Sequence, residues 1–221
     1  MKFIKLSLAA ALVVTMTFAD ENNSEIGVSA NVAMTSNYVW RGMTQSDDSA
    51  AIQGGFDLDY KGLYAGVWGS NVNFGAGSDA SMEFDAYGGY TNELYGIGYD
   101  IGYIQYAYPN DSKASNFGEA YASLSKDFKI VKVSAKYYVG VTTDDINPEN
   151  GYELGASIPL PMDISLDGNF GKYDNVGIYY LAGLTKTFGK FDFNVAYTSM
   201  DFEDTATKSQ NNVVATISTS F

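Results

Sequence analysis

Regular alternation between apolar and polar residues is the feature that most limits how this 221-residue chain can fold. It is clearest over residues 26–41. The even positions there are mostly apolar and end in Tyr38 and Trp40, whereas the odd positions are mostly small or polar and end in Arg41, the only arginine of the chain. A period of two residues is typical of a β-strand whose faces meet different environments. The pattern predicts one strand over 26–41, longer than the roughly 9–11 residues that a tilted strand needs to cross a bilayer.

The same alternation returns along the whole chain. Clear examples cover residues 50–60, 81–90, 97–103, 131–139, 152–158, 191–198 and 212–221, and weaker ones lie near 63–72, 117–125, 164–170 and 177–187. Longer loops rich in Asp, Asn, Ser and Gly alternate with tight turns between these segments. An even number of strands with this loop pattern is the plan of an outer-membrane barrel. We therefore expect an all-β fold, a transmembrane antiparallel β-barrel of about 12 strands.

The N-terminal residues have the layout of an export signal. In "MKFIKLSLAAALVVTMTFAD", two lysines precede a short apolar run, and Thr17-Phe18-Ala19 resembles a cleavage site. This predicts a cleaved signal peptide over 1–19 and a barrel domain over 20–221. No later segment approaches the roughly 18 apolar residues of a membrane-spanning helix. The expected location is the outer membrane of a Gram-negative bacterium, reached through the periplasm.

The composition excludes several classes of function. The chain contains neither cysteine nor histidine, which rules out disulfides, Cys/His zinc sites and catalytic systems that need a histidine. The net charge of −13 argues against nucleic acid as a partner, because phosphates require basic surfaces. We therefore predict that the protein is not an enzyme and that it uses no cofactor and no metal.

One part of the sequence resembles a known family. The segment "SNYVWRGMTQSDDSAAIQGGFDLDYKGLYAGVWGSNVNF" over 36–74, followed by "EFDAYGGY" over 83–90, is similar to the TorF-type porin family of proteobacteria. The similarity is strongest over 35–90. It implies an outer-membrane barrel and passive transport, and it supplies neither a substrate nor functional residues.

The polar strand faces provide the candidate pore-lining residues. If the apolar faces meet lipid, the side chains that point inward are Arg41, Asp57, Asp59, Glu83, Asp85, Asp100, Lys132, Lys136, Glu153 and Asp192. Acids exceed bases in this set, and carboxylates favour cations along a water-filled path. Arg41 has two possible roles that can coexist. It can brace crowded carboxylates, because a guanidinium binds them in bidentate fashion, or it can act as a selectivity charge at a constriction.

Aromatic residues near the strand ends suggest contacts with the membrane interface. Tyrosine and tryptophan concentrate there because each combines an apolar ring with a polar edge, and this explanation is favoured over sugar stacking. The predicted girdle consists of Trp40, Tyr60, Trp68, Tyr90 and Tyr197. The terminal Phe221 ends an alternating strand, which resembles the signal by which barrel proteins are taken up for outer-membrane assembly.

These features predict a porin-like channel for passive diffusion of small hydrophilic solutes through an acidic lumen that prefers cations. The expected partners are outer-membrane lipid, lipopolysaccharide, the barrel-assembly machinery and the solutes themselves. The alternative is a closed structural or adhesive barrel that acts through its extracellular loops. Twelve strands lie between filled eight-stranded barrels and open larger ones, so strand number does not separate the two.

Overall fold

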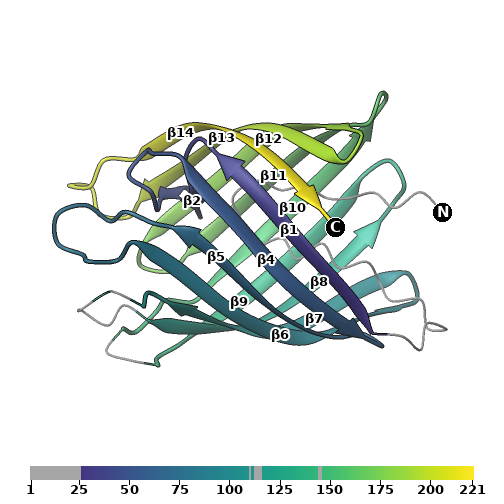
Figure 1. The fold of residues 1–221 in the computed structure, drawn as a ribbon, viewed down its shortest axis with the longest axis horizontal. Helices are drawn as coiled ribbons and strands as arrows, with labels where there is room; N and C mark the ends of the chain where they lie inside the picture. The colour runs from purple at the N-terminus through teal and green to yellow at the C-terminus, as the bar shows by residue number, and fades with distance from the viewer. Residues whose placement is uncertain (1–25, 110, 112–115, 144–145) are drawn as a thin grey trace.

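The computed structural model describes residues 26–109, 111, 116–143 and 146–221. Twelve antiparallel strands form a closed barrel, and two further short strands pair with each other (Figure 1). The prediction of an antiparallel 12-stranded barrel is confirmed. The predicted signal peptide lies outside the described residues. The described part of the chain has no helix that is long and apolar enough to span a membrane.

The barrel strands follow the chain order, and each pairs with the next in sequence. They are β1 (Gly27–Thr35), β4 (Ala51–Tyr60), β5 (Leu63–Asn71), β6 (Met82–Leu94), β7 (Ile97–Ala107), β8 (Phe117–Asp127), β9 (Lys132–Val141), β10 (Gly151–Leu160), β11 (Ile164–Tyr173), β12 (Gly177–Phe188), β13 (Phe191–Phe202) and β14 (Gln210–Ser220). The weaker segments of the sequence are thus strands as well.

The alternation separates the two faces of the wall. Along β13, for example, Phe193 and Val195 are exposed on the outside, whereas Asn194 and Ala196 are buried on the inside. The barrel therefore carries an outer surface of large apolar side chains and an interior, here called the lumen, of mainly polar, small and tyrosine side chains. An apolar outside with a polar inside is what a bilayer and an aqueous lumen require of a barrel.

The ends of the chain close the barrel. Strand β1 pairs with β14 over Asn31–Thr35 and residues 216–220. Beyond this ladder, the backbone N–H of Phe221 donates to the carbonyl oxygen of Ala30 at 2.9 Å, and the N–H of Ala30 donates back at 3.2 Å. Closure removes the free edges that an open sheet would present.

The first strand is shorter than the sequence predicts. Strand β1 ends at Thr35, and residues 36–50 turn away from the wall instead of extending it. Within them, β2 (Val39–Trp40) pairs with β3 (Met43–Thr44), and Arg41 and Gly42 form the turn with positive φ angles of 49° and 79°. The threonine hydroxyl of Thr35 donates to the carbonyl of Asn37 at the point where the chain leaves the sheet. We call residues 36–50 the inserted segment.

Candidate functional site

The inserted segment crosses the lumen near the end that carries the long loops. Its residues Asn37, Tyr38, Val39 and Ser46 are buried, and the short strand β2 lies inside the outline of the barrel in Figure 1. The side chain of Arg41, at the turn, reaches strands β8 and β9, which are five and six strands away from β1 around the ring. In a ring of twelve strands these form the opposite wall. Through this side chain, the segment therefore connects β1 with the opposite wall of the lumen.

Arg41 anchors the tip of this segment. Its Nη1 and Nη2 atoms donate to Oε1 and Oε2 of Glu119 on β8, at 2.7 and 2.8 Å. The side chains of both residues are buried, with 9% and 4% of their surface exposed. The guanidinium carbon also lies 3.6 Å from the ring centre of Tyr138 and 4.9 Å from that of Tyr173. Arg41 is therefore held by a bidentate ion pair within a box of aromatic rings.

The position of Arg41 differs from the one predicted. It does not continue the inward face of β1 but occupies the turn between β2 and β3. The next residue, Gly42, approaches β13 so closely that a Cβ atom would collide with the carbonyl of Ser199. A side chain there would push the turn away from the wall, so the tip depends on this glycine.

Two of the predicted girdle residues lie inside the barrel, and their assignment is corrected. Trp40 belongs to β2 and makes edge contacts with Tyr106 and Tyr173 at ring-centre distances of 6.0 and 5.7 Å. Trp68 points inward from β5 and contacts Tyr38 at 5.5 Å. Both indoles thus pack around the inserted segment and not at the membrane interface. Their amphipathic character suits a buried, partly polar lumen as well as a bilayer surface.

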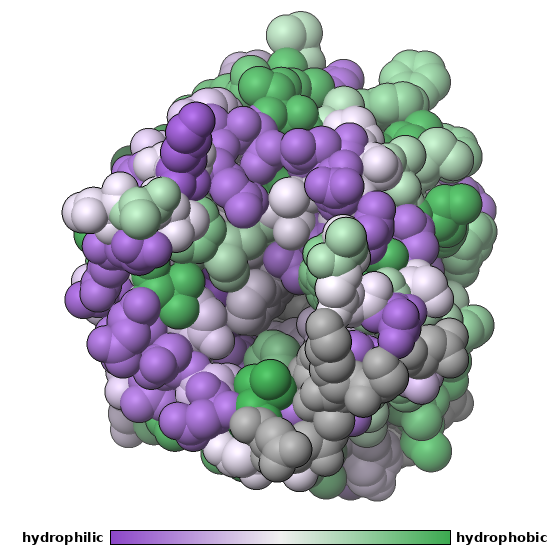
Figure 2. All heavy atoms as spheres, turned by 90° about the vertical axis from the view of Figure 1, so that its left-hand side faces the viewer, coloured by the Kyte–Doolittle hydropathy of each residue, from purple (hydrophilic) through white to green (hydrophobic). Residues whose placement is uncertain are grey.

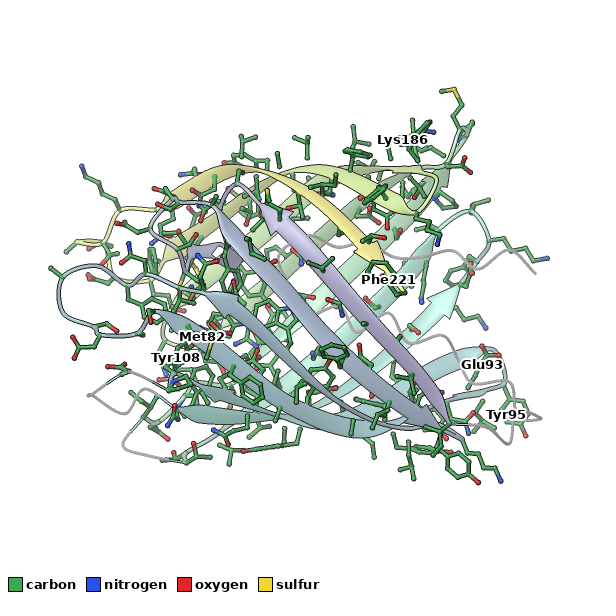
Figure 3. All side chains as sticks on the ribbon, viewed as in Figure 1. Met82, Glu93, Tyr95, Tyr108, Lys186 and Phe221 are labelled. Atoms are coloured by element: carbon green, nitrogen blue, oxygen red, sulfur yellow. The ribbon has the colours of Figure 1, made fainter. Side chains whose placement is uncertain are left out.

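The other three girdle residues have the orientation expected of them. Tyr60 and Tyr197 are exposed on the outer face, and Tyr90 lies on the outward-facing side of β6. The turn end of the barrel, where Tyr60 and Tyr90 lie, is marked in Figure 3 by the labelled residues Glu93, Tyr95 and Lys186. Phe221 is also exposed, and the structure does not test its predicted role in assembly.

Glu83 and Asp85 lie next to Tyr38, near the start of the inserted segment. Both point inward from the loop end of β6, with 2% and 0% of their surface exposed. The hydroxyl of Tyr38 donates to Oε1 of Glu83 at 3.0 Å. Oε2 of Glu83 and both carboxylate oxygens of Asp85 have no hydrogen-bond donor among the described residues.

Closer to the turn end, inward carboxylates accept hydrogen bonds from tyrosines. The hydroxyl of Tyr64 donates to Asp100 at 2.7 Å and also contacts the hydroxyl of Tyr121. Tyr87 donates to Asp57 at 2.5 Å. On the other side of the lumen, Tyr179 and Asn169 donate to Glu153 at 3.1 and 3.3 Å. These hydroxyls and amides hold the carboxyl groups in fixed positions along the wall of the lumen.

The remaining candidate residues also lie on inward faces. Asp59 shares the inward face of β4 with Asp57, and Lys132 and Lys136 share that of β9. The ammonium nitrogen of Lys136 lies 4.0 Å from the ring centre of Tyr121. Asp192 accepts a hydrogen bond from Thr187 at 2.6 Å near the turn end. The candidates therefore spread along the lumen. Arg41 belongs to the inserted segment, and Glu83 accepts a hydrogen bond from its Tyr38.

Two inward acids were missed by sequence reasoning. Glu119, the partner of Arg41, and Asp167 lie on strands whose alternation is weak, so neither was assigned to a face. Asp167 is buried and accepts hydrogen bonds from Ser157 and Ser165 at 2.6 and 2.7 Å. The sequence offered one signal for a carboxylate partner: Arg41 is the single arginine of a chain that contains 26 acidic residues.

Charged and polar residues also gather around the loop end. Viewed from that end, the molecule shows a rim of hydrophilic residues and a hollow towards its centre (Figure 2). Within the described ranges, no group of three or more acidic side chains is arranged to hold a metal ion. The described part of the lumen thus combines buried carboxyl groups and tyrosine side chains with the pinned inserted segment.

Solved structures with the same architecture are outer-membrane barrels. The fold is similar to the KdgM porin, with a TM-score of 0.61 and 8% identity over 87% of this chain and 98% of the other. It is also similar to KdgM porin in complex with disordered oligogalacturonate, with a TM-score of 0.61 and 9% identity over 88% and 98% of the two chains. A third match is the Salmonella typhi outer membrane phospholipase dimer with bound calcium, with a TM-score of 0.60 and 13% identity over 90% and 94%.

These likenesses establish the fold alone, because the identities are low and the matched proteins include porins as well as an enzyme. No curated protein matches the sequence. A family model does match it, and it covers nearly the whole chain, from residue 19 to residue 221. The chain belongs to the Gcw_chp family, described as bacterial protein of unknown function.

Proposed function

We propose that this protein is a porin-like channel of the bacterial outer membrane, through which small hydrophilic solutes diffuse passively. The observation that carries the proposal is the lumen itself. It is enclosed by twelve strands, lined by hydrogen-bonded carboxylates, and narrowed by a segment that Arg41 pins to Glu119. Fixed charges at a narrowed passage select solutes by size and sign.

The charge of the lumen supports a preference for cations. Its carboxylates are held mainly by neutral hydroxyl groups, as in the pairs of Tyr64 with Asp100 and Tyr87 with Asp57. Arg41 is occupied by Glu119 and adds no net positive charge to that pair. Carboxylates that remain charged and are not paired with bases attract cations and repel anions.

The cellular setting belongs to the same proposal. The apolar outer surface suits contact with outer-membrane lipid and lipopolysaccharide, and residues 1–19 would direct export through the periplasm. Phe221 would act in recognition by the barrel-assembly machinery. The resemblance of residues 35–90 to TorF-type porins supports passive transport. The phospholipase fold neighbour does not point to catalysis here, because the chain contains no histidine to act as a base.

Single-channel recording tests this function. The mature chain, refolded and inserted into a planar bilayer, is expected to give discrete conductance steps with a reversal potential that indicates cation preference in a KCl gradient. Arg41→Ala should increase the conductance, because the tip of the inserted segment loses its anchor. The control is Glu203→Gln, which breaks the exposed Lys172–Glu203 pair outside the lumen and should leave the conductance unchanged.

A closed barrel that acts through its loops is the second candidate. The observation that favours it is the tight burial of the inserted segment, in which Tyr38 and Val39 are almost inaccessible. Absence of any conductance from correctly folded, inserted protein would reject the channel and favour this alternative. Conductance that appears only in Arg41→Ala would show that the segment is a plug in the resting protein.

A further inference from the structure

The buried carboxyl pair Glu83 and Asp85 has no role in the proposed passage of solutes. The two residues are separated by one position on β6, so their side chains point to the same side of the strand. Both carboxyl groups are buried on this one face of the strand, where each acts on the other. Yet ionised carboxylates can only accept, and two acceptors in contact repel each other.

Among the described residues, the side chains that face this pair are uncharged or acidic. Tyr38 donates to Glu83 from the inserted segment, and Tyr108 faces both carboxyl groups from the end of β7. Tyr106 on β7 faces them as well. Glu119 on β8 adds a further negative charge near Asp85, and its own counter-charge is Arg41. On β5, the cross-strand neighbours of the pair are the uncharged Ser70 and Trp68.

A contrast within the same barrel shows what is unusual here. Asp167 is as deeply buried as Glu83, but hydroxyls of Ser157, Ser165 and Thr185 all donate to it, at 2.6, 2.7 and 3.5 Å. By comparison, three of the four oxygens of Glu83 and Asp85 have no donor among the described residues. Those three oxygens are also inaccessible to a sphere the size of a water molecule. A proton can be placed between the carboxyl groups without any rearrangement of the packing around them.

We propose that Glu83 and Asp85 form a proton-binding site in which the two carboxyl groups share one proton at neutral pH, and that this site latches the inserted segment. With the proton in place, one carboxyl group donates to the other, and the contact becomes a hydrogen bond. Two carboxyl groups in contact cannot both ionise readily, so they lose their protons in two separate steps.

Loss of the shared proton has a structural consequence. At alkaline pH the O–H bond breaks, the proton combines with hydroxide in bulk water, and the pair carries two negative charges in a packed environment. Water must then reach the carboxylates. Strand β6 is held by complete ladders to β5 and β7, whereas the inserted segment rests on Glu83 through the side chain of Tyr38. The inserted segment is therefore the part that moves, and alkaline pH should separate Tyr38 from Glu83.

Infrared spectroscopy tests the proton directly. In the full mature protein at neutral pH, the difference spectrum between parent and Asp85→Asn should contain the C=O stretch of a protonated carboxyl group. Asp167→Asn is the matched control, because it removes an equally buried carboxyl whose oxygens accept hydrogen bonds from hydroxyl groups. Glu83→Gln is a second variant that should also remove the band. If neither Asp85→Asn nor Glu83→Gln alters this band, the proton-binding site is refuted.

Cysteine labelling tests the latch. The chain has no cysteine, so Val39→Cys places a single thiol on a residue of which only 1% is exposed. Its labelling rate is divided by that of an exposed Ser209→Cys at each pH, because thiolate content also rises with pH. The ratio should increase as the pH is raised from neutral into the alkaline range, because the shared proton is lost there. In the Asp85→Asn background the ratio should stay constant. A protonated band combined with a pH-independent ratio in the parent would reject the latch.

Discussion

Replacing Arg41 with alanine is expected to release the tip of the inserted segment while the barrel stays closed. The substitution leaves Glu119 buried without its counter-charge, with 4% of its side-chain surface exposed. Removing one partner of a buried ion pair costs about 3–5 kcal/mol. Opening the tip lets water reach Glu119 and recovers much of this cost. The barrel ladders do not involve Arg41, so the loss should appear as local opening and not as global unfolding.

The assay is the labelling rate of Val39→Cys at fixed pH, because that residue is protected only while the segment is seated. Each 1.4 kcal/mol corresponds to a factor of ten, so the Arg41→Ala variant should label about 100- to 4,000-fold faster than the parent. Adding Glu119→Gln should recover part of the protection, since it removes the stranded charge.

The control variant is Glu203→Gln, which breaks an exposed pair in which 36% of Lys172 and 45% of Glu203 is accessible. Exposed pairs contribute about 0–1 kcal/mol, so labelling should change by less than about tenfold. A rate for Arg41→Ala within twofold of the parent would refute the reasoning, because it would mean that the ion pair does not hold the segment.

Three further predictions concern other parts of the barrel. Gly66→Ala should destabilise the protein by about 1–3 kcal/mol in urea unfolding, because a Cβ atom would lie 2.5 Å from the ring of Tyr87; an unchanged midpoint would contradict this close packing. Asp167→Ala should cost about 1–3 kcal/mol in the same assay, since it leaves buried hydroxyl groups without an acceptor, and Asp167→Asn should cost less. At the loop end, the pKa of Asp204 is lowered by the backbone N–H of Ala206 and then by the hydroxyl of Thr207. A lowered folded-state pKa stabilises the loop above the unfolded-state pKa, and that stabilisation is lost as the pH falls through the folded-state value. Thr207→Ala should raise the pKa of Asp204 in an NMR titration, and an unchanged pKa would count against the hydrogen bond.

The barrel could be predicted from the sequence because its two environments impose a period of two on every strand. Phe193 and Asn194 differ in polarity because they face different environments: Phe193 lies on the outer face of the wall and Asn194 on the lumen face. Short turns and longer loops then follow from the antiparallel order. This information is local, and a single strand contains it.

The inserted segment could not be predicted in the same way. Residues 36–41 continue the alternation of β1, and Tyr38 and Trp40 fall on the positions of its apolar face. What takes them out of the wall is a contact with Glu119, which lies 78 residues further along the chain. Long-range contacts of this kind override the local pattern. Trp68 was assigned to the membrane interface for a related reason, since a lumen rich in tyrosine accepts the same residue types as an interface.

The crossing of the lumen by Arg41 also has a mechanical consequence. A ring of hydrogen-bonded strands resists stretching around its circumference, but it can flatten, because neighbouring strands bend against each other at little cost. A segment that is attached to two opposite walls of the barrel resists this flattening. One end of the inserted segment is continuous with β1 and β4, and the other is held at β8 and β9. The ion pair of the single arginine with Glu119 is therefore expected to resist flattening of the barrel at this level, in addition to narrowing the lumen.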